Sequence, residues 1–320
     1  MADMHTVFNG AEMARVSKRI YYFRSVGVDG QPVDFSQEVA ALTDGFPTIS
    51  QSEMTFVDDV VRVQRFKDSP NGRLYHLAKY SPGTKNSTLT PKAKTKTDRE
   101  TGHSAPPGKE FKSGECFLLI NGYHILFCSH GINQAKAGYY FQKLISSAGQ
   151  DVEEFKLKPT SNLDKLKILN EQGVRSVRLD VSAYKLSLPN RKRNWLTKAI
   201  TPVVNELSAL VAKDATRSEE QALEDLIVTV EVGLEGNSRA SDDSKSTVID
   251  LAAEFIDENE FDVDAFTIIT RENISITGHD IRLHTAVTVE KTDNSVNHVD
   301  IWDALQVYYA QLKKQKLLEK

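Results

Sequence analysis

An Asn-Gly dipeptide between two apolar runs places the strongest constraint on how the first half of this 320-residue chain folds. Asn121 and Gly122 separate the run ECFLLI from the run YHILFC. This dipeptide between apolar segments is the strongest short-range signal for a β-hairpin. A helix-compatible segment follows from about residue 132 to residue 147. The stretch 114–149 therefore predicts two antiparallel strands followed by a helix that covers them.

The two cysteines of the chain lie in this hairpin. If Asn121 and Gly122 form the turn, Cys116 lies opposite Phe127 and Cys128 points to the other face of the sheet. A disulfide between them is then not expected. Reduced thiols, the lack of a long apolar run and the lack of an apolar leader core together predict a cytoplasmic protein without membrane insertion.

Strand-like and helix-like segments intermix without the regular alternation of a doubly wound sheet. We therefore expect an α+β fold with mixed or antiparallel sheets and covering helices. The length suits two domains, an N-terminal α+β domain over residues 1–150 and a C-terminal α+β domain over residues 151–320. A final helix is expected from about residue 299 to residue 320, with a helical spacing of Trp302, Leu305, Tyr308, Tyr309 and Leu312.

The net charge of −4 conceals a strong asymmetry along the chain. Residues 214–264 carry 16 acidic and 3 basic side chains, a net charge of −13, whereas the first 213 residues carry a net charge of +9. A basic region attracts anionic partners such as nucleic acid. The acidic segment is interpreted either as solvated helix surface or as a surface that masks basic groups or docks a partner.

Residues 81–113 have the composition of a long loop inside the N-terminal domain. They are rich in Pro and Gly and carry seven basic against three acidic residues, and long insertions in compact domains are commonly functional or disordered. A second basic group precedes a predicted helix after Pro189, where the helix start also favours phosphate. The candidate nucleic-acid-binding residues are Lys85, Lys92, Lys94, Lys96, Arg99, Lys109, Lys112, Arg191, Lys192 and Arg193.

Known catalytic motifs do not occur in the sequence, which has no G-x-S-x-G elbow, no P-loop and no dinucleotide fingerprint. In the hairpin His124 and Cys128 share a face, but nothing nearby provides an obvious third and fourth metal ligand, so neither a metal nor a cofactor is expected. Glu154 and Lys156 form an E-x-K pair at the start of a predicted strand. This pair leaves a Mg²⁺-dependent nuclease or toxin as the enzymatic alternative.

The predicted hairpin and helix resemble a segment of bacterial DNA-binding proteins. The residues from Leu119 to Ser129, followed by Ala135 to Leu144, resemble RdgC-type nucleoid proteins and, more loosely, RexA-type prophage exclusion proteins. The strand–helix–Gly–Val–strand pattern of residues 155–181 is similar to phage-defence proteins of the KwaB type from Kiwa systems. These resemblances imply DNA binding in a bacterial genome-conflict setting and assign no individual residue.

The sequence thus predicts a cytoplasmic, homo-oligomeric DNA-binding protein of a bacterial phage-defence or prophage-exclusion system. Its basic loop and helix-start residues would contact the nucleic-acid backbone, of DNA rather than RNA, with little or no catalysis. Two alternatives stay open. One is the nuclease that uses Glu154 and Lys156. The other is a protein–protein adaptor, in which the acidic segment 214–264 and the aromatic C-terminal helix dock a partner.

Overall fold

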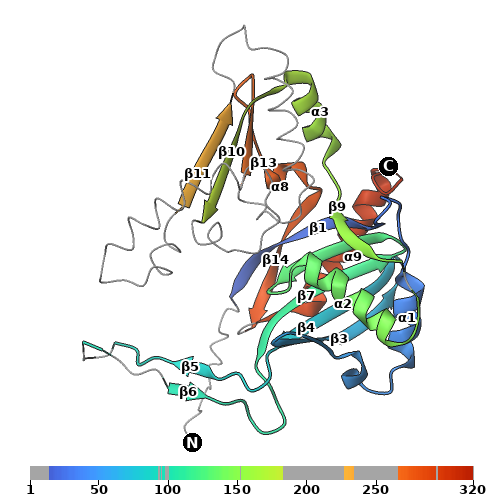
Figure 1. Ribbon diagram of the computed structural model, residues 1–320, viewed down its shortest axis with the longest axis vertical. Helices are drawn as coiled ribbons and strands as arrows, with labels where there is room; N and C mark the ends of the chain where they lie inside the picture. Colours follow the sequence, from blue (N-terminus) through green and yellow to red (C-terminus); the bar gives the residue numbers. More distant parts are fainter. Residues whose placement is uncertain are drawn as a thin grey trace, which may run out of the picture. The chain divides into compact units, whose positions relative to one another are not determined.

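Antiparallel sheets and a few covering helices give the chain the α+β fold that its sequence predicts (Figure 1). The computed structural model describes residues 14–92, 94, 96–97, 101–151, 153–182, 227–233, 266–292 and 295–319. It divides the chain into two compact units. The first contains the described residues of Met1–Thr160 and His284–Lys320, and the second those of Ser161–Leu283.

A nine-stranded antiparallel sheet forms the centre of the first unit. The strands follow the order β15-β14-β1-β8-β7-β4-β3-β2, and β9 also pairs with β1. These strands are β1 (Arg15–Gly27), β2 (Met54–Phe56), β3 (Asp59–Ser69), β4 (Gly72–Tyr80), β7 (Lys112–Asn121), β8 (His124–His130), β9 (Phe155–Pro159), β14 (His284–Thr292) and β15 (Ser295–Val296).

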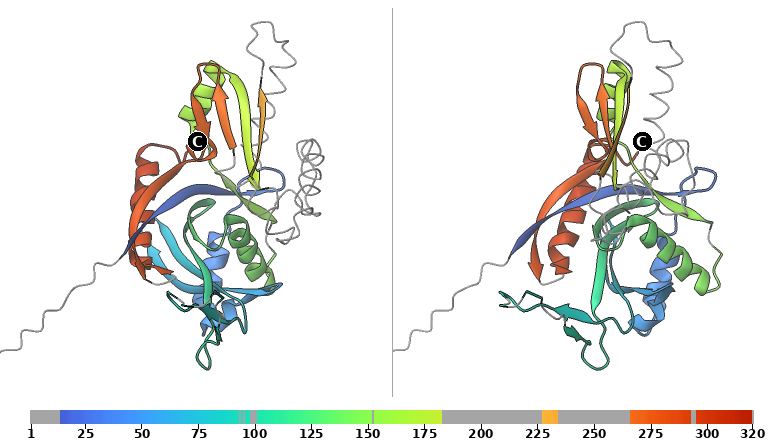
Figure 2. Two further views of the ribbon diagram at one scale, coloured as in Figure 1. Left: turned by 90° about the vertical axis from the view of Figure 1, so that its left-hand side faces the viewer. Right: turned by 60° about the vertical axis from the view of Figure 1, so that its left-hand side comes forward.

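Helices cover this sheet on both faces (Figures 1 and 2). Tyr140 and Phe141 of one helix pack on alternate strand residues such as Leu118. A second helix buries Leu305 against the opposite face. Because both faces are buried, β7 reads as a continuous apolar run rather than an alternating one. The described helices of this unit are α1 (Ser36–Gly45), the 3-10 helix η1 (Ile49–Ser52), α2 (Gln134–Ser147) and α9 (His298–Lys314).

The predicted hairpin is formed by β7 and β8, but its turn lies one residue further along the chain. Asn121 pairs with His124, so Gly122 and Tyr123 form the turn. Gly122 takes a φ of 61° there, a conformation that glycine adopts without a steric penalty. Cys116 consequently lies opposite Ser129 rather than Phe127.

The expected facing of the two cysteines is confirmed, because the register changes by an even number of residues. Cys116 belongs to the core under α2, whereas Cys128 pairs with Phe117 and points to the other face. Both thiols are buried and free, and burial raises the pKa of each of them. They are therefore inert core residues.

The division of the chain differs from the boundary expected at residues 150 and 151. The antiparallel pairing of β14 with β1 runs from Arg15 opposite Glu290 to Tyr21 opposite His284, and α9 packs on the same sheet. The last part of the chain therefore completes the first unit. Pairing between the first and the last long strand is a non-local contact, which sequence patterns do not reveal.

The second unit contains a four-stranded antiparallel sheet in the order β11-β10-β12-β13. A capping box at Thr277 and Asp280 begins the short helix α8. The elements are α3 (Leu163–Gln172), β10 (Val174–Ser182), β11 (Ile227–Gly233), β12 (Phe266–Thr270), β13 (Ser275–Thr277) and α8 (Gly278–Ile281).

Replacing Leu305 by alanine tests whether α9 belongs to the core of the first unit. Leu305 is 0% exposed, so we expect Leu305→Ala to lower the free energy of unfolding by about 2–5 kcal/mol. Val307 on the same helix is 58% exposed, and Val307→Ala should change it by less than about 0.5 kcal/mol. Urea unfolding of both variants provides the measurement. Equal, small effects would contradict the packing of α9 on the sheet.

Candidate functional site

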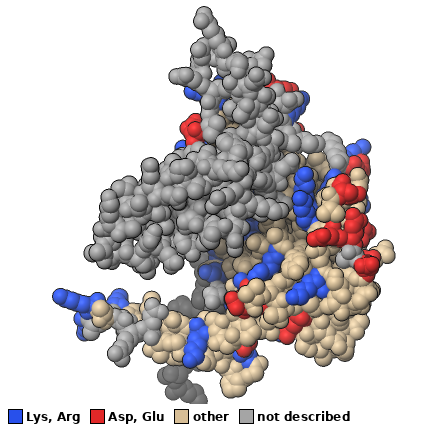
Figure 3. Space-filling view, in the orientation of Figure 1, with Lys and Arg blue, Asp and Glu red and all other residues tan. Residues whose placement is uncertain are grey.

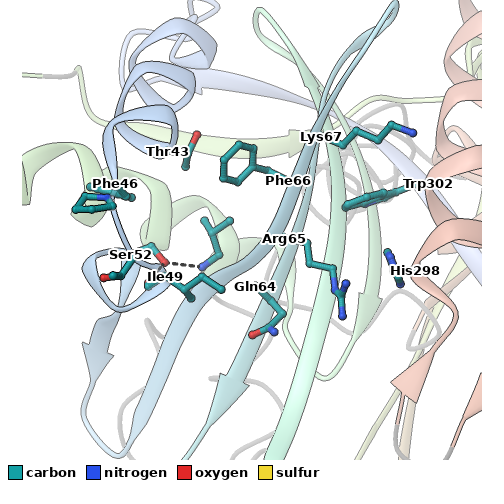
Figure 4. Close-up of a pocket in the computed structure, with 13 residues that line it drawn as sticks. Thr43, Phe46, Ile49, Ser52, Gln64, Arg65, Phe66, Lys67, His298 and Trp302 are labelled. Carbon is teal, nitrogen blue, oxygen red and sulfur yellow. Dashed lines mark hydrogen bonds between the residues drawn. The ribbon is translucent and has the colours of Figure 1, made fainter.

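Two adjoining hollows lie between the start of α9 and strands β3 and β4 in the first unit. The polar hollow, of about 620 Å³, is lined by Arg62, Arg65, His76, Lys79, Lys109 and Lys112 among others. The apolar hollow, of about 520 Å³, is lined by Phe46, Ile49, Phe66, Lys67 and Trp302 among others (Figure 4). The two hollows share Gln64, Arg65 and His298 and are here called the cleft.

A β-bulge in β3 determines which side chains enter the cleft. Val63 pairs with Leu77 and Arg65 pairs with His76, so Gln64 is the extra residue. Val63 and Leu77 face the core under α2, and regular alternation would turn Arg65 to that face. The bulge instead places Arg65 beside His76 on the α9 side. Bulges commonly redirect side chains in this way next to functional sites.

A fully buried carboxylate, Glu115 of β7, holds the wall of the polar hollow together. It accepts hydrogen bonds from His76 Nε2 at 2.8 Å and Lys112 Nζ at 2.6 Å. It also accepts from Ser295 Oγ at 2.9 Å and from the backbone nitrogen of Val296 at 3.1 Å. These four donors connect β4, β7 and β15, three strands that are distant in sequence.

Glu115 is ionised throughout the physiological pH range. Burial opposes the charge of its carboxylate, but the hydrogen bonds from His76 and Lys112 outweigh that effect and lower its pKa to about 2. An ionised carboxylate in a core is stable only with partners of this kind. Lys112, expected to contact phosphate, therefore has its ammonium engaged with Glu115 and Ser295.

Four rings follow one another along the cleft wall. The ring of His76 lies 4.5 Å from that of Phe117 and 6.4 Å from that of His298, and both pairs are nearly parallel. Trp302 meets His298 edge to face, with the ring centroids 5.2 Å apart. Within the described residues His76 Nδ1 and Trp302 Nε1 are buried without a hydrogen-bond partner. Three further buried side-chain atoms, of Arg73, Tyr75 and Gln172, also have no hydrogen-bond partner among the described residues.

The charge around His298 is positive. Burial and the neighbouring Arg65 and His76 lower the pKa of His298, against a weaker opposing effect of Glu115. The Arg65 guanidinium takes part in no salt bridge among the described residues. The shared edge of the two hollows thus presents an unneutralised cation beside a histidine that stays neutral at pH 7.

The predicted basic loop contains a two-stranded antiparallel ribbon, here called the basic ribbon (residues 85–103). Its strands are β5 (Asn86–Thr88) and β6 (Thr101–His103), and it projects from the large sheet in Figure 1 and in the right-hand view of Figure 2. Basic side chains are visible along it in Figure 3. Its described cations are exposed and take part in no salt bridge within the described ranges: Lys85, Lys92, Lys94 and Lys96.

The other predicted nucleic-acid contacts have different positions. Lys109 is exposed and lines the polar hollow. The segment that follows the ribbon in the chain therefore lies at the cleft. Arg99 and the cluster Arg191, Lys192 and Arg193 lie outside the described residues. Whether that cluster joins the ribbon therefore stays a prediction.

The nuclease alternative gains no geometric support. Glu154 and Lys156 are exposed at the start of β9, whereas the intervening Phe155 is buried in the core. Within the described part of the chain no three His, Cys, Asp or Glu side chains are placed to hold a metal ion. In the hairpin, His124 Nδ1 bonds Tyr22 at 2.6 Å instead.

The adaptor alternative loses one of its two surfaces. The aromatic face of α9, including Trp302, Tyr308 and Tyr309, is buried and so is not open to a partner. Most of the acidic segment 214–264 lies outside the described residues.

Comparison with known proteins returned no match to any family model, curated protein or solved structure. No helix in the described ranges is both long enough and apolar enough to span a bilayer.

Sequence reasoning missed the cleft residues Arg65, His76, Glu115 and His298. One sequence signal was present, because Glu115 begins the apolar run of a strand that is buried on both faces, and a charge in such a strand requires partners. The bulge at Gln64 has no comparable signal. His298 resembles any scattered surface or core histidine in the sequence, because α9 brings it to the cleft only in the folded chain.

Acid unfolding tests the role of Glu115. Its pKa is about 2 in the folded protein and about 4.5 in a freely solvated state. The ionised carboxylate therefore stabilises the fold above about pH 4.5, and this contribution is lost as the pH falls toward 2. We expect Glu115→Gln to lose about 1.5–3 kcal/mol of stability at pH 7 and to show a flatter stability curve between pH 5 and pH 2 by urea unfolding.

The exposed carboxylate of Glu110 provides the matched control. Glu110→Gln should leave both the stability at pH 7 and its acid dependence close to those of the unaltered protein. An acid dependence that Glu115→Gln leaves intact would contradict the buried network.

Proposed function

We propose that this protein binds the phosphate backbone of nucleic acid through the basic ribbon. One observation carries the proposal: Lys85, Lys92, Lys94 and Lys96 stand on a projecting two-stranded element and are unpaired within the described residues. No described carboxylate forms a salt bridge with these four lysines, so their charges are available to an external anion.

Duplex DNA is the partner that suits this arrangement. It carries one negative charge per about 1.7 Å of helix axis, so a short lysine-bearing ribbon meets several phosphates wherever it lies along the duplex. Lysine ammonium groups are flexible point charges that do not select a base. The expected binding is therefore tolerant of sequence and sensitive to salt.

The cleft offers a second set of cations next to the ribbon. Lys109 follows the ribbon in the chain and lines the polar hollow, and Arg65 lies at the edge shared by the two hollows. Both are exposed. Lys112 is bound to Glu115, so the segment that returns from the ribbon is anchored where it enters β7. This arrangement favours a path of the nucleic-acid backbone along the ribbon towards the sheet.

The biological setting is proposed from the resemblance in sequence. The resemblance of residues 119–129, 135–144 and 155–181 to bacterial genome-conflict proteins supports a role in phage defence or prophage exclusion. A homo-oligomer would place several ribbons on one DNA and strengthen weak individual contacts.

Neutralising three ribbon lysines tests the proposal. In Lys92→Gln/Lys94→Gln/Lys96→Gln we expect weaker binding to duplex DNA at low salt. The slope of log affinity against log salt should also become shallower by up to about 0.9 for each phosphate that the variant no longer neutralises. Fluorescence anisotropy with a labelled duplex at several salt concentrations gives both quantities.

A matched control removes the same charge from another exposed position. Lys313, Lys314 and Lys316 are exposed at the end of α9, and each triplet includes one lysine with positive φ, 54° at Lys92 and 56° at Lys316. The glutamine variant of this triplet should retain the original affinity and slope. An equal loss of DNA affinity in both variants would show that only net charge matters and would contradict binding by the ribbon.

A further inference from the structure

We propose that the cleft binds a nucleoside monophosphate, with the base in the apolar hollow and the phosphate at Arg65 and Lys67. The inference goes beyond phosphate-backbone contact by the ribbon, because it rests on residues of β3, η1 and α9 instead. The ligand is either a free nucleotide or an unpaired nucleotide of a strand that the protein binds.

The apolar hollow has the lining that a base requires. Phe66 is 41% exposed and Ile49 is 45% exposed, and both line it together with Phe46. The guanidinium of Arg73 lies over the Phe66 ring at 4.4 Å, which leaves the rest of that ring to the hollow. Bases stack on aromatic rings and on apolar side chains in this manner. The volume of about 520 Å³ falls in the usual range for small-molecule sites.

The phosphate end is provided by the other side of the same strand. Arg65 lies opposite His76 and Lys67 opposite Leu74, so both point to the α9 side, whereas the intervening Phe66 points to the α1 side. Figure 4 shows these side chains lining the same hollow from β3. Both cations are exposed and lack a salt bridge within the described residues. An arginine fork with a neighbouring lysine is well suited to a terminal phosphate.

The backbone between these two ends is also open. Strand β2 pairs with β3 only from Asp59 to Val61. The next outward-facing backbone group, the Val63 nitrogen, is bonded, because it donates to Ser52 Oγ at 3.1 Å (Figure 4). No described strand pairs with the outer edge of β3 from Gln64 onward. Free backbone N–H and C=O groups at such an edge can hydrogen-bond the polar edge of a base.

A bound nucleotide would act as an effector, or as the anchored end of a strand.

The test is isothermal titration calorimetry of the full chain with AMP, GMP, CMP and UMP. Adenosine and inorganic phosphate serve as probes for the two halves of the site. We expect at least one monophosphate to bind at least about tenfold more tightly than either fragment, because the hollow and the cations act together. Arg65→Gln/Lys67→Gln should weaken that affinity by about tenfold or more, and Ile49→Trp should do the same by filling the hollow. Unchanged thermal melting would verify the fold of both variants.

The ribbon variant Lys92→Gln/Lys94→Gln/Lys96→Gln is the matched control and should bind the monophosphate normally. Absence of heat at millimolar nucleotide, or inorganic phosphate binding as tightly as the nucleotide, would overturn the proposal. An affinity unaffected by both cleft variants would overturn it as well. Retained duplex binding in that case would leave the ribbon proposal standing, so the two failures are distinguishable.

A short single-stranded oligonucleotide separates the two sources of the ligand. Displacement of the bound monophosphate by the oligonucleotide, in a manner that depends on Arg65, supports an unpaired nucleotide of a strand. Binding of the monophosphate without such competition supports a free effector.

Discussion

The buried carboxylate of Glu115 is the interaction on which the geometry of the cleft depends. A charge inside a sheet that is covered on both faces is stable only if every lone pair finds a donor. Glu115 meets this condition with donors from His76, Lys112, Ser295 and Val296. The same contacts orient the His76 ring and fix the segment that returns from the basic ribbon. The network thus connects the two proposed binding surfaces to one point in the core.

The β-bulge at Gln64 is the second constraint. Without the extra residue, Arg65 would point into the apolar core under α2, where an unpaired guanidinium is costly. The bulge turns Arg65 outward beside His76. The outer edge of β3 beyond Val61 has no partner strand in the described residues, because β2 is only three residues long.

Local features of the fold were predictable from the sequence, whereas features made by distant contacts were not. The hairpin, the covering helix, the α+β class and the facing of Cys116 and Cys128 follow from turn chemistry and from the two-residue period of a strand. The pairing of β14 with β1 joins residues near the two ends of the chain. No periodicity encodes that contact, so sequence patterns place the domain boundary too early and α9 in the second domain.

The candidate site shows the same division. The lysines of the basic ribbon were predictable because composition alone separates a polar, basic insertion from core strands. The cleft needed the fold: His76, Glu115 and His298 come from three elements that are far apart in sequence, and the position of Arg65 depends on a one-residue bulge. Lys112 belongs to the basic insertion by composition, yet its ammonium is engaged with a buried carboxylate.

The most direct test of nucleic-acid binding by the ribbon is the chemical reactivity of individual lysines. Acetylation followed by mass spectrometry, with and without saturating duplex DNA, reports on each ammonium group separately. The account predicts that Lys85, Lys92, Lys94 and Lys96 are protected by DNA while the lysines at the end of α9 stay reactive. Ribbon lysines that react equally with and without DNA would contradict it.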